Sequence, residues 1–239
     1  MCVAAIAWHA DPRWRLIAIG NRDEYHTRPT APLGQWDNGI IAGRDLAAGG
    51  TWLGLHPAGR FALVTNYRVD GYPRPELASR GGLVTDWLLN EALGDTAAMN
   101  PFNLFVASGA QAWLYSNYPA PLARLLAPGI HGLSNGALDR PWRKTLCLES
   151  ALSAWLAQDS ADPAALFLAL ADRELDPTPP PNGPRPDFSG VFIADPVYGT
   201  RASTVVLIDH AGRGTIIERR FAAVGKPAGE STLAFTWPA

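Results

Sequence analysis

Short apolar segments separated by turn-forming residues restrict the fold of this chain more than any other feature of its sequence. Segments of this kind, bounded by Gly, Pro, Asn and Asp, are typical of β-strands. In the first part of the chain they cover residues 2–8, 16–20, 40–43, 51–55 and 61–65. The first part of the chain is therefore predicted to be a β-meander.

Helical patterns cluster in the middle of the chain. Ser79 is a good N-cap for a first helix, residues 83–89 supply its apolar face, and Gly94 lies where a C-terminal stop is expected. A second helix is predicted to begin at Asp139, and a third to run over residues 163–170. The helices are thus expected to lie between two sets of strands.

Further strand patterns flank these helices, at residues 102–107, 112–116, 191–194, 203–209 and 215–219. Residues 209–212 are predicted to form a hairpin turn, and the proline-rich residues 176–187 an extended surface loop. The order of strands, helices and strands predicts an α+β fold with layered sheets, in a single domain over residues 1–239.

Composition argues against several classes of partner. Of the 239 residues 47% are hydrophobic, and the net charge is only −2 with the positive charges spread along the sequence. No electrostatic footprint for nucleic acid or an anionic membrane is present, and no apolar run approaches the roughly 18 residues that suggest a membrane span. We expect a soluble, cytoplasmic protein whose partner is neither nucleic acid nor a membrane.

The cysteines and histidines predict neither a disulfide framework nor a metal site. The chain has two cysteines and five histidines, with no CxxC or HExxH spacing. We therefore expect no metal held by the protein. Cys147 lies among leucines in a predicted helix and is interpreted as a core residue without a role in function.

Cys2 is the strongest single candidate for chemistry. If Met1 is removed, Cys2 carries both a thiol nucleophile and an α-amine, and an α-amine titrates near pH 8, low enough to act as the base for its own thiol. The strand that follows would hold this terminus in place. The alternative is that Cys2 is simply a small buried hydrophobic residue.

Polar residues follow two of the predicted strands directly. Asn21, Arg22, Asp23 and Glu24 follow the second strand, where alternation places Asn21 and Asp23 on one face and Arg22 on the other. We expect Asn21 and Asp23 to face the thiol, and Arg22 to point away and pair with Glu24 or Asp45. The alternative is an ordinary charged turn.

Two amides and one arginine complete the polar set. Asn66 ends a strand and Asn135 lies between glycine-containing turns, so both are candidates to donate hydrogen bonds to an oxyanion, although either could simply stabilise a turn. Arg201 precedes an apolar strand and is a candidate to fix a carboxylate or to stabilise Asp23; its alternative is an ordinary edge charge.

The chain resembles the NRDE family, also called the transport and Golgi organisation protein 2 family, over nearly its whole length. The resemblance rests on ordered motifs: Met1-Cys2, Asn21-Arg22-Asp23-Glu24, Arg28-Pro29, Gly49-Gly50-Thr51-Trp52-Leu53-Gly54, Thr65-Asn66-Tyr67, Gly132-Leu133-Ser134-Asn135, Pro141-Trp142-Arg143-Lys144 and Tyr198-Gly199-Thr200-Arg201.

This resemblance implies the fold of the N-terminal nucleophile hydrolases, a four-layer αββα sandwich. The choloylglycine hydrolases and penicillin V acylases of that fold are similar in their polar residues, which implies a catalytic set of Cys2, Asp23, Asn66, Asn135 and Arg201. Their first motif has the order Arg-Asn-x-Asp, whereas here Gly20 precedes Asn21-Arg22-Asp23, so the arginine is displaced.

The resemblance implies two functions. The first is a cysteine hydrolase that acts on C–N (amide) bonds of a small molecule and needs no cofactor, with Asn21, Arg22, Tyr67 and His26 contacting the substrate. The second is a haem-binding and haem-trafficking protein, or an acyl-lipid or acyl-CoA binder, on a vestigial hydrolase fold. For haem, Cys2, His26 or a tyrosine would ligate the iron.

Overall fold

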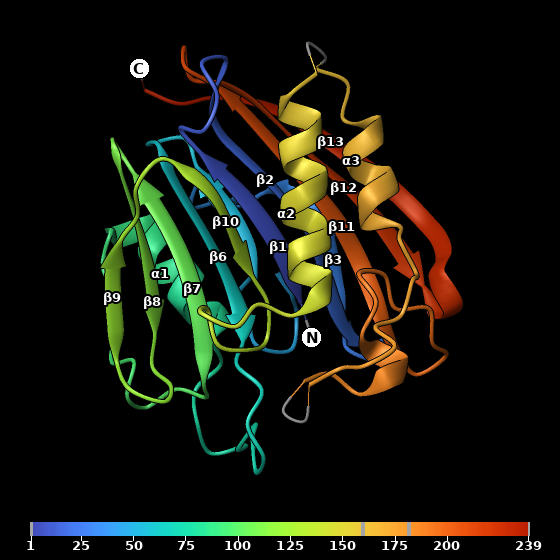
Figure 1. Cartoon of the computed structure of the whole chain (residues 1–239). Helices are drawn as coiled ribbons and strands as arrows, with labels where there is room; N and C mark the ends of the chain where they lie inside the picture. The colour runs from blue at the N-terminus through green and yellow to red at the C-terminus, as the bar shows by residue number, and fades with distance from the viewer. Residues whose placement is uncertain (1, 159–160, 181–182, 239) are drawn as a thin grey trace.

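Two antiparallel sheets pack face to face, with helices on both outer faces (Figure 1). The computed structural model describes residues 2–158, 161–180 and 183–238. Strand alternation assigns the apolar residues to three cores: one between the sheets and one between each sheet and its helices. The predicted four-layer αββα sandwich of the α+β class is confirmed.

The first sheet has six strands in the order β10-β1-β2-β11-β12-β13. Its central strands are largely buried on both faces, so β1 is apolar along its length and β11 contains an apolar run over residues 205–208. Its strands are β1 (Val3–Trp8), β2 (Trp14–Tyr25), β10 (Gly129–Leu133), β11 (Tyr198–Asp209), β12 (Arg213–Ala222) and β13 (Lys226–Thr236).

The second sheet has seven strands in sequence order. The predicted strands at residues 40–43, 51–55 and 61–65 belong to it, whereas those at residues 2–8 and 16–20 became β1 and β2 of the first sheet, so the prediction of one meander for the first part of the chain is wrong. Its strands are β3 (Thr30–Gln35), β4 (Ile41–Asp45), β5 (Leu53–His56), β6 (Arg60–Asn66), β7 (Phe102–Ser108), β8 (Gln111–Ser116) and β9 (Leu122–Leu125).

The helices α2 (Arg143–Leu156) and α3 (Ala164–Leu170) cover the first sheet, and α1 (Gly81–Asn90) covers the second. Short 3-10 turns are present at η1 (Pro186–Phe188) and η2 (Ala223–Gly225). In the part of the chain that the structure describes, no helix is long and apolar enough to span a membrane.

Each predicted helix is present, with shifted ends. The first begins at Gly81 instead of Ser79, and it ends at Asn90, where Glu91 takes the left-handed conformation (φ 55°) that Gly94 was expected to supply. The second begins at Arg143 instead of Asp139, with Trp142 as its N-cap in an extended conformation. The hairpin turn between β11 and β12 is confirmed.

The predicted strand at residues 191–194 is wrong. Residues 191–193 are buried, and Val191 packs in the core under the helices. Their backbone groups bond outside any sheet: the Phe192 N–H donates to the carbonyl of Asp172, and the Ile193 N–H donates to the hydroxyl of Thr200. Strands β3, β9, β10 and β13 were not expected, since they lie at or near sheet edges; every residue of β9 is exposed. Of the predicted loop 176–187, residues 181–182 lie outside the described chain.

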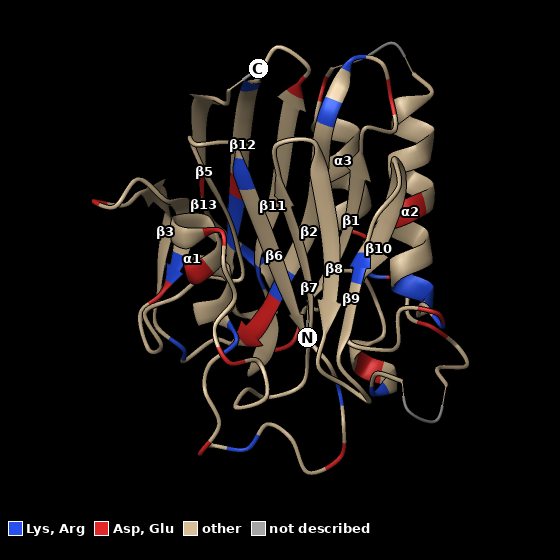
Figure 2. Ribbon diagram, turned by 90° about the vertical axis from the view of Figure 1, so that its left-hand side faces the viewer, with Lys and Arg blue, Asp and Glu red and all other residues tan. Residues whose placement is uncertain are grey.

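Charged residues are distributed over many elements. In Figure 2, Lys and Arg segments alternate with Asp and Glu segments over the molecule, and most of the ribbon carries neither.

Cys147 is half-buried at the margin of the core between α2 and the first sheet, whereas its neighbour Leu146 is exposed. Cys147 therefore packs on the core without being enclosed by it.

Candidate functional site

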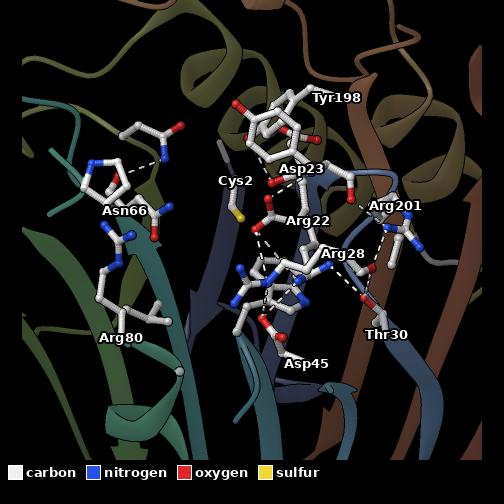
Figure 3. Close-up of a pocket in the computed structure, with 18 of the residues that line it drawn as sticks. Cys2, Arg22, Asp23, Arg28, Thr30, Asp45, Asn66, Arg80, Tyr198 and Arg201 are labelled. Carbon is white, nitrogen blue, oxygen red and sulfur yellow. Dashed lines mark hydrogen bonds and ion pairs between the residues drawn. The ribbon is translucent and has the colours of Figure 1, made fainter. Parts of the chain in front are cut away.

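A cleft of about 1030 Å³ opens between the two sheets, where β2 and β6 end and α1 and β11 begin. Such a volume suits a small organic ligand. Figure 3 shows Cys2 between Asn66 and Arg80 on one side and Asp23 and Arg22 on the other. The cleft is lined by all five residues of the predicted catalytic set, Cys2, Asp23, Asn66, Asn135 and Arg201.

Cys2 lies directly before β1, and alternation decides where its thiol points. Val3 belongs to the core under the helices and Ala4 to the core between the sheets, so Cys2 faces the space between the sheets. The side chain is only 7% exposed. Burial raises the pKa of the Cys2 thiol, the Asp23 carboxylate adds to this, and Arg22 opposes it. The predicted removal of Met1 concerns a residue outside the described chain.

Asp23 is buried beside Cys2 near the end of β2, at 3% exposure. Its Oδ1 accepts a hydrogen bond of 2.7 Å from the Thr200 hydroxyl, and its backbone carbonyl accepts one of 2.9 Å from the Tyr198 hydroxyl. Burial raises the pKa of the Asp23 carboxyl, whereas Lys144, Thr200 and Arg22 oppose the rise. Thr200 thus supplies the contact with Asp23 that the sequence reasoning assigned to Arg201.

Lys144 is the main residue that the sequence reasoning missed as part of the site. It lies in the first turn of α2, is 2% exposed, and its ammonium group is 3.4 Å from Asn135 Oδ1. Burial lowers the pKa of Lys144, and the nearby Asp23 and Cys2 oppose this effect. The signal in the sequence was its position in the Pro141-Trp142-Arg143-Lys144 motif. Its burial in the structure is a second signal, since lysine is almost never fully buried unless it is paired.

The two predicted amides have different surroundings. Asn135 is fully buried; its Oδ1 accepts from Lys144, and its Nδ2 donates a hydrogen bond of 2.8 Å to the carbonyl of Asn66. Asn66 is exposed in the cleft, and its side-chain amide forms no hydrogen bond with any residue the structure describes. Asn66 is therefore the amide that is free to donate to a ligand, while Asn135 holds it in place.

The structure places Arg22 differently from the prediction. Val3 pairs with Asn21 across the first sheet, so the next pair is Cys2 with Arg22, and their side chains share a face. The expectation that Asn21 would face the thiol and Arg22 would point away is wrong. Asp23 lies on the same face as Asn21, but it reaches the cleft because β2 extends past the start of β1.

Arg22 does pair with the predicted carboxylates, in a cluster that we call the rim. The rim consists of Arg22, Glu24, Arg28 and Asp45. Asp45 Oδ2 lies 2.7 Å from Arg28 Nε and 3.4 Å from Arg22 Nη2, while Glu24 lies 4.0 Å from Arg22 and 3.8 Å from Arg28. Opposite charges favour the ionised forms, so the pKa of Asp45 is lowered and that of Arg28 is raised even though burial alone would act the other way.

Arg201 lies in a bulge of β11, because the pairing with β2 shifts between Thr200 and Ala202. Its guanidinium donates to three backbone carbonyls, those of Tyr25 (2.9 Å), His26 (3.2 Å) and Arg28 (3.1 Å). Arg201 therefore holds the turn that carries Arg28, instead of binding a carboxylate.

Two of the predicted ligand contacts lie outside the cleft. Asn21 is fully buried under the helices, where it donates to the carbonyls of Leu170 and Val191 and accepts from Ser203. His26 is 3.0 Å from the carbonyl of Asp195 and packs against Gly199. Tyr67 does line the cleft. Neither Asn21 nor His26 is placed to contact a ligand there.

Arg80 also lines the cleft and was not predicted. It directly precedes α1, and its Nη1 donates to the carbonyl of Pro101 at 3.1 Å.

Among the residues that the structure describes, no group of three or more His, Cys, Asp or Glu side chains is arranged to hold a metal ion.

Comparison with known proteins identifies relatives over most of the chain. The sequence matches the family described as Transport and Golgi organisation 2 over residues 1–223. The Transport and Golgi organization protein 2 homologs of Bos taurus and Homo sapiens are 33% and 32% identical, each match covering 92% of this chain and 92% of the relative. The Drosophila melanogaster protein is 27% identical and covers 96% of this chain and 95% of its own length.

Two solved structures share the fold at low sequence identity. One is the Caenorhabditis elegans ortholog of N-acylethanolamine-hydrolyzing acid amidase, with a TM-score of 0.54 and 14% identity over 86% of this chain and 92% of that chain. The other is the C2A mutant of the conjugated bile acid hydrolase from Clostridium perfringens, with a TM-score of 0.53 and 8% identity over 100% and 97%. The fold is that of the N-terminal nucleophile hydrolases.

Proposed function

The chain belongs to the Transport and Golgi organisation 2 family and has the fold of N-terminal nucleophile hydrolases, and we propose that it hydrolyses the C–N bond of a small-molecule amide with Cys2 as nucleophile. One observation carries the proposal: the Cys2 thiol, at the start of a central strand, lines a ligand-sized cleft beside Asp23 and Asn66. Both structural neighbours are named as hydrolases, which supports the same reaction class.

The buried thiol needs a base, because its raised pKa leaves it protonated at neutral pH. After removal of Met1 the α-amine of Cys2 is such a base: it takes the thiol proton as sulfur attacks the carbonyl carbon of the amide. Asp23, close to this end of the chain, orients the amine and stabilises it once it is protonated. The ammonium group then gives its proton to the leaving nitrogen as the C–N bond breaks, leaving a thioester.

Two further parts of the cleft support the reaction. The amide of Asn66 is free to donate a hydrogen bond to the oxyanion of the tetrahedral intermediate, an interaction worth about 3 kcal/mol in other enzymes. Lys144 donates to the side chain of Asn135, which in turn donates to the carbonyl of Asn66, and this chain of hydrogen bonds fixes the backbone of Asn66. Water attacks the thioester in the second half-reaction, with the α-amine as base, and releases the acid and the thiol.

Mass spectrometry and a substrate panel test the proposal. The intact mass is expected to show loss of Met1, and a panel of N-acyl aminocoumarin amides is expected to show turnover that Cys2→Ala removes by about 1000-fold or more. Cys147→Ala is the matched control, since it removes the other thiol of the chain. Retention of Met1 in the purified protein, or turnover by Cys2→Ala equal to that of the wild type, would contradict the mechanism.

The second candidate function is haem carriage, which the composition of the cleft supports. Besides Cys2, the cleft is lined by Tyr25, Tyr67, Tyr72 and Tyr198, whose oxygens are possible iron ligands, and by Trp52 and Phe188, which offer apolar surface. His26 lies outside the cleft and drops out of the ligand set. Titration with haem is expected to give a saturable Soret shift with one haem per chain, lost on substitution of the ligating residue. Unsaturable binding would count against haem carriage.

A further inference from the structure

Arg80 differs from Arg22 and Arg28, the two cleft arginines that contact the carboxylates of the rim. Arg22 and Arg28 share Asp45 and Glu24 on the rim. Arg80 lies across the cleft, on the side of Asn66 (Figure 3), and forms no ion pair with any residue that the structure describes. Within the described residues its side chain forms one hydrogen bond, to the Pro101 carbonyl, which leaves most of its five N–H donors without a partner among them.

Arg80 is also held at a fixed position. A Cβ added at Gly50 would lie 2.6 Å from the carbonyl carbon of Gly81, so only glycine allows the loop after β4 to pack against the start of α1. The Gly49-Gly50-Thr51 motif thus fixes the helix start, and with it the residue just before the helix. The hydrogen bond to the Pro101 carbonyl restrains the guanidinium itself, and a guanidinium held in place loses little freedom when it binds a ligand.

The environment of Arg80 favours an anion. Burial lowers its pKa to about 10, and the nearby Cys2 and Glu24 oppose the lowering. The group is therefore cationic at neutral pH, but partly dehydrated and without an ion-pair partner in the described part of the chain. Such a group gains from an anion that enters the cleft, because the anion replaces lost hydration with charge-assisted hydrogen bonds.

We propose that Arg80 binds the anionic group, a carboxylate or a phosphate, of the ligand that occupies the cleft. The inference rests on the proposed function for the site and goes further by naming the substrate class: an amide that carries an acidic group, with its carbonyl near Cys2 and its acid near Arg80. A guanidinium accommodates carboxylate and phosphate equally well, through paired N–H donors.

Equilibrium binding tests this assignment without relying on turnover. Calorimetric titration of the full chain with glutarate, phenyl phosphate and the neutral glutaramide is expected to show at least about tenfold tighter binding of one of the anions than of glutaramide. Whether glutarate or phenyl phosphate binds more tightly identifies the acidic group. Anions that bind no better than glutaramide would overturn the assignment.

Variants locate the effect. Arg80→Met is expected to remove the preference for anions, and Arg80→Lys to keep part of it because the charge remains. Arg124→Met, which removes an exposed arginine from β9 outside the cleft, is the matched control and is expected to bind as the wild type does. Thermal unfolding without ligand checks that each variant folds, and Arg80→Gln replaces Arg80→Met if the latter does not. An unchanged anion preference in the Arg80 variants would contradict the proposal.

Paired substrates separate this inference from the hydrolase proposal. With glutaryl and pentanoyl amides of aminocoumarin, Arg80→Met is expected to raise KM about tenfold for the glutaryl amide only. Anion binding that depends on Arg80, in a protein without turnover, would contradict the hydrolase proposal and support the anion site. Turnover of the glutaryl amide that Arg80→Met leaves unchanged would support the hydrolase proposal and contradict the anion site.

Discussion

The floor of the cleft and its rim hold charged groups in opposite ways. The floor consists of Cys2 and Asp23, which line the cleft, and of Lys144, which is buried behind them next to Asn135. There burial is the largest effect and moves every pKa toward the neutral form: upward for the thiol and the carboxyl, downward for the ammonium. On the rim, Asp45 and Arg28 are less enclosed and form ion pairs, so their pKa values move toward the charged form.

This difference separates reactivity from stability. Groups whose charged form is disfavoured by burial respond strongly to nearby charges, and such perturbed groups are typical of acid–base catalysis. Groups whose charge is favoured stay ionised and mainly hold structure. The floor is therefore expected to control chemistry, and the rim to contribute modestly to folding. Each of the following substitutions tests one side of this comparison.

The largest effect is expected from Asp23→Asn. It keeps the size of the side chain but removes the charge that we propose orients the α-amine, so turnover of the amide panel should fall by about 100-fold or more. Because the Asp23 carboxylate raises the pKa of the Cys2 thiol, alkylation of Cys2 should reach its midpoint at lower pH in this variant. Glu24→Gln, on the rim, is the control. An unchanged midpoint would show that Asp23 and Cys2 are not coupled.

Lys144→Met is expected to act on the thiol in the opposite direction. The ammonium group favours the ionised forms of Asp23 and Cys2, so its removal should raise the pKa of both. The alkylation midpoint of Cys2 should move to higher pH, and turnover should fall by about tenfold as Asn135 loses its partner. Lys226→Met, an exposed lysine of β13, is the control. A shift to lower pH would contradict the proposed arrangement of the floor.

Asp45→Asn tests the rim and should affect folding by about 1 kcal/mol or less, because the pairs are partly exposed. Its folded pKa lies below the ordinary 3.8, so the ion pairs stabilise the protein above that pH, and their contribution is lost as pH falls through the folded pKa. The difference in free energy of unfolding between wild type and variant should therefore disappear in acid and shrink with salt. Denaturant unfolding at several pH values measures it. A difference that grows in acid would reverse this assignment.

Cys147→Ala is expected to have the smallest effect. The half-buried thiol packs at the margin of a core and does not line the cleft, so turnover and ligand binding should be unchanged, with a loss of stability of about 1 kcal/mol or less. Steady-state kinetics and thermal unfolding check both. Loss of activity in a folded Cys147→Ala protein would assign this cysteine a function that its position does not suggest.

Much of the fold could be read from the sequence because its central elements carry strong local patterns. The strands that became β1, β6 and β11 each contain an apolar run, and the three helices have apolar faces. Edge strands such as β9 and β13 carry little such pattern, and residues 191–194 were misread because burial against a helix gives the same apolar run as burial in a sheet.

The candidate site was predictable in membership but not in orientation. Polar residues at strand ends pointed to Cys2, Asp23 and Asn66, and all of them line one cleft. The face on which each side chain lies depends on register across the sheet, and no local pattern contains that register. This is why Arg22 was placed on the wrong side and Asn21 in the cleft.

The sequence by itself determined the layers of the fold and the residue types available for chemistry, because apolar periodicity and turn residues act over short distances along the chain. Tertiary structure alone decided which polar groups are buried together. Lys144, Asn135 and Asp23 come from separate parts of the chain, and their pKa shifts exist only because folding removes water around all three at once. Electrostatic coupling acts through space, so it appears only once the distant segments have packed together.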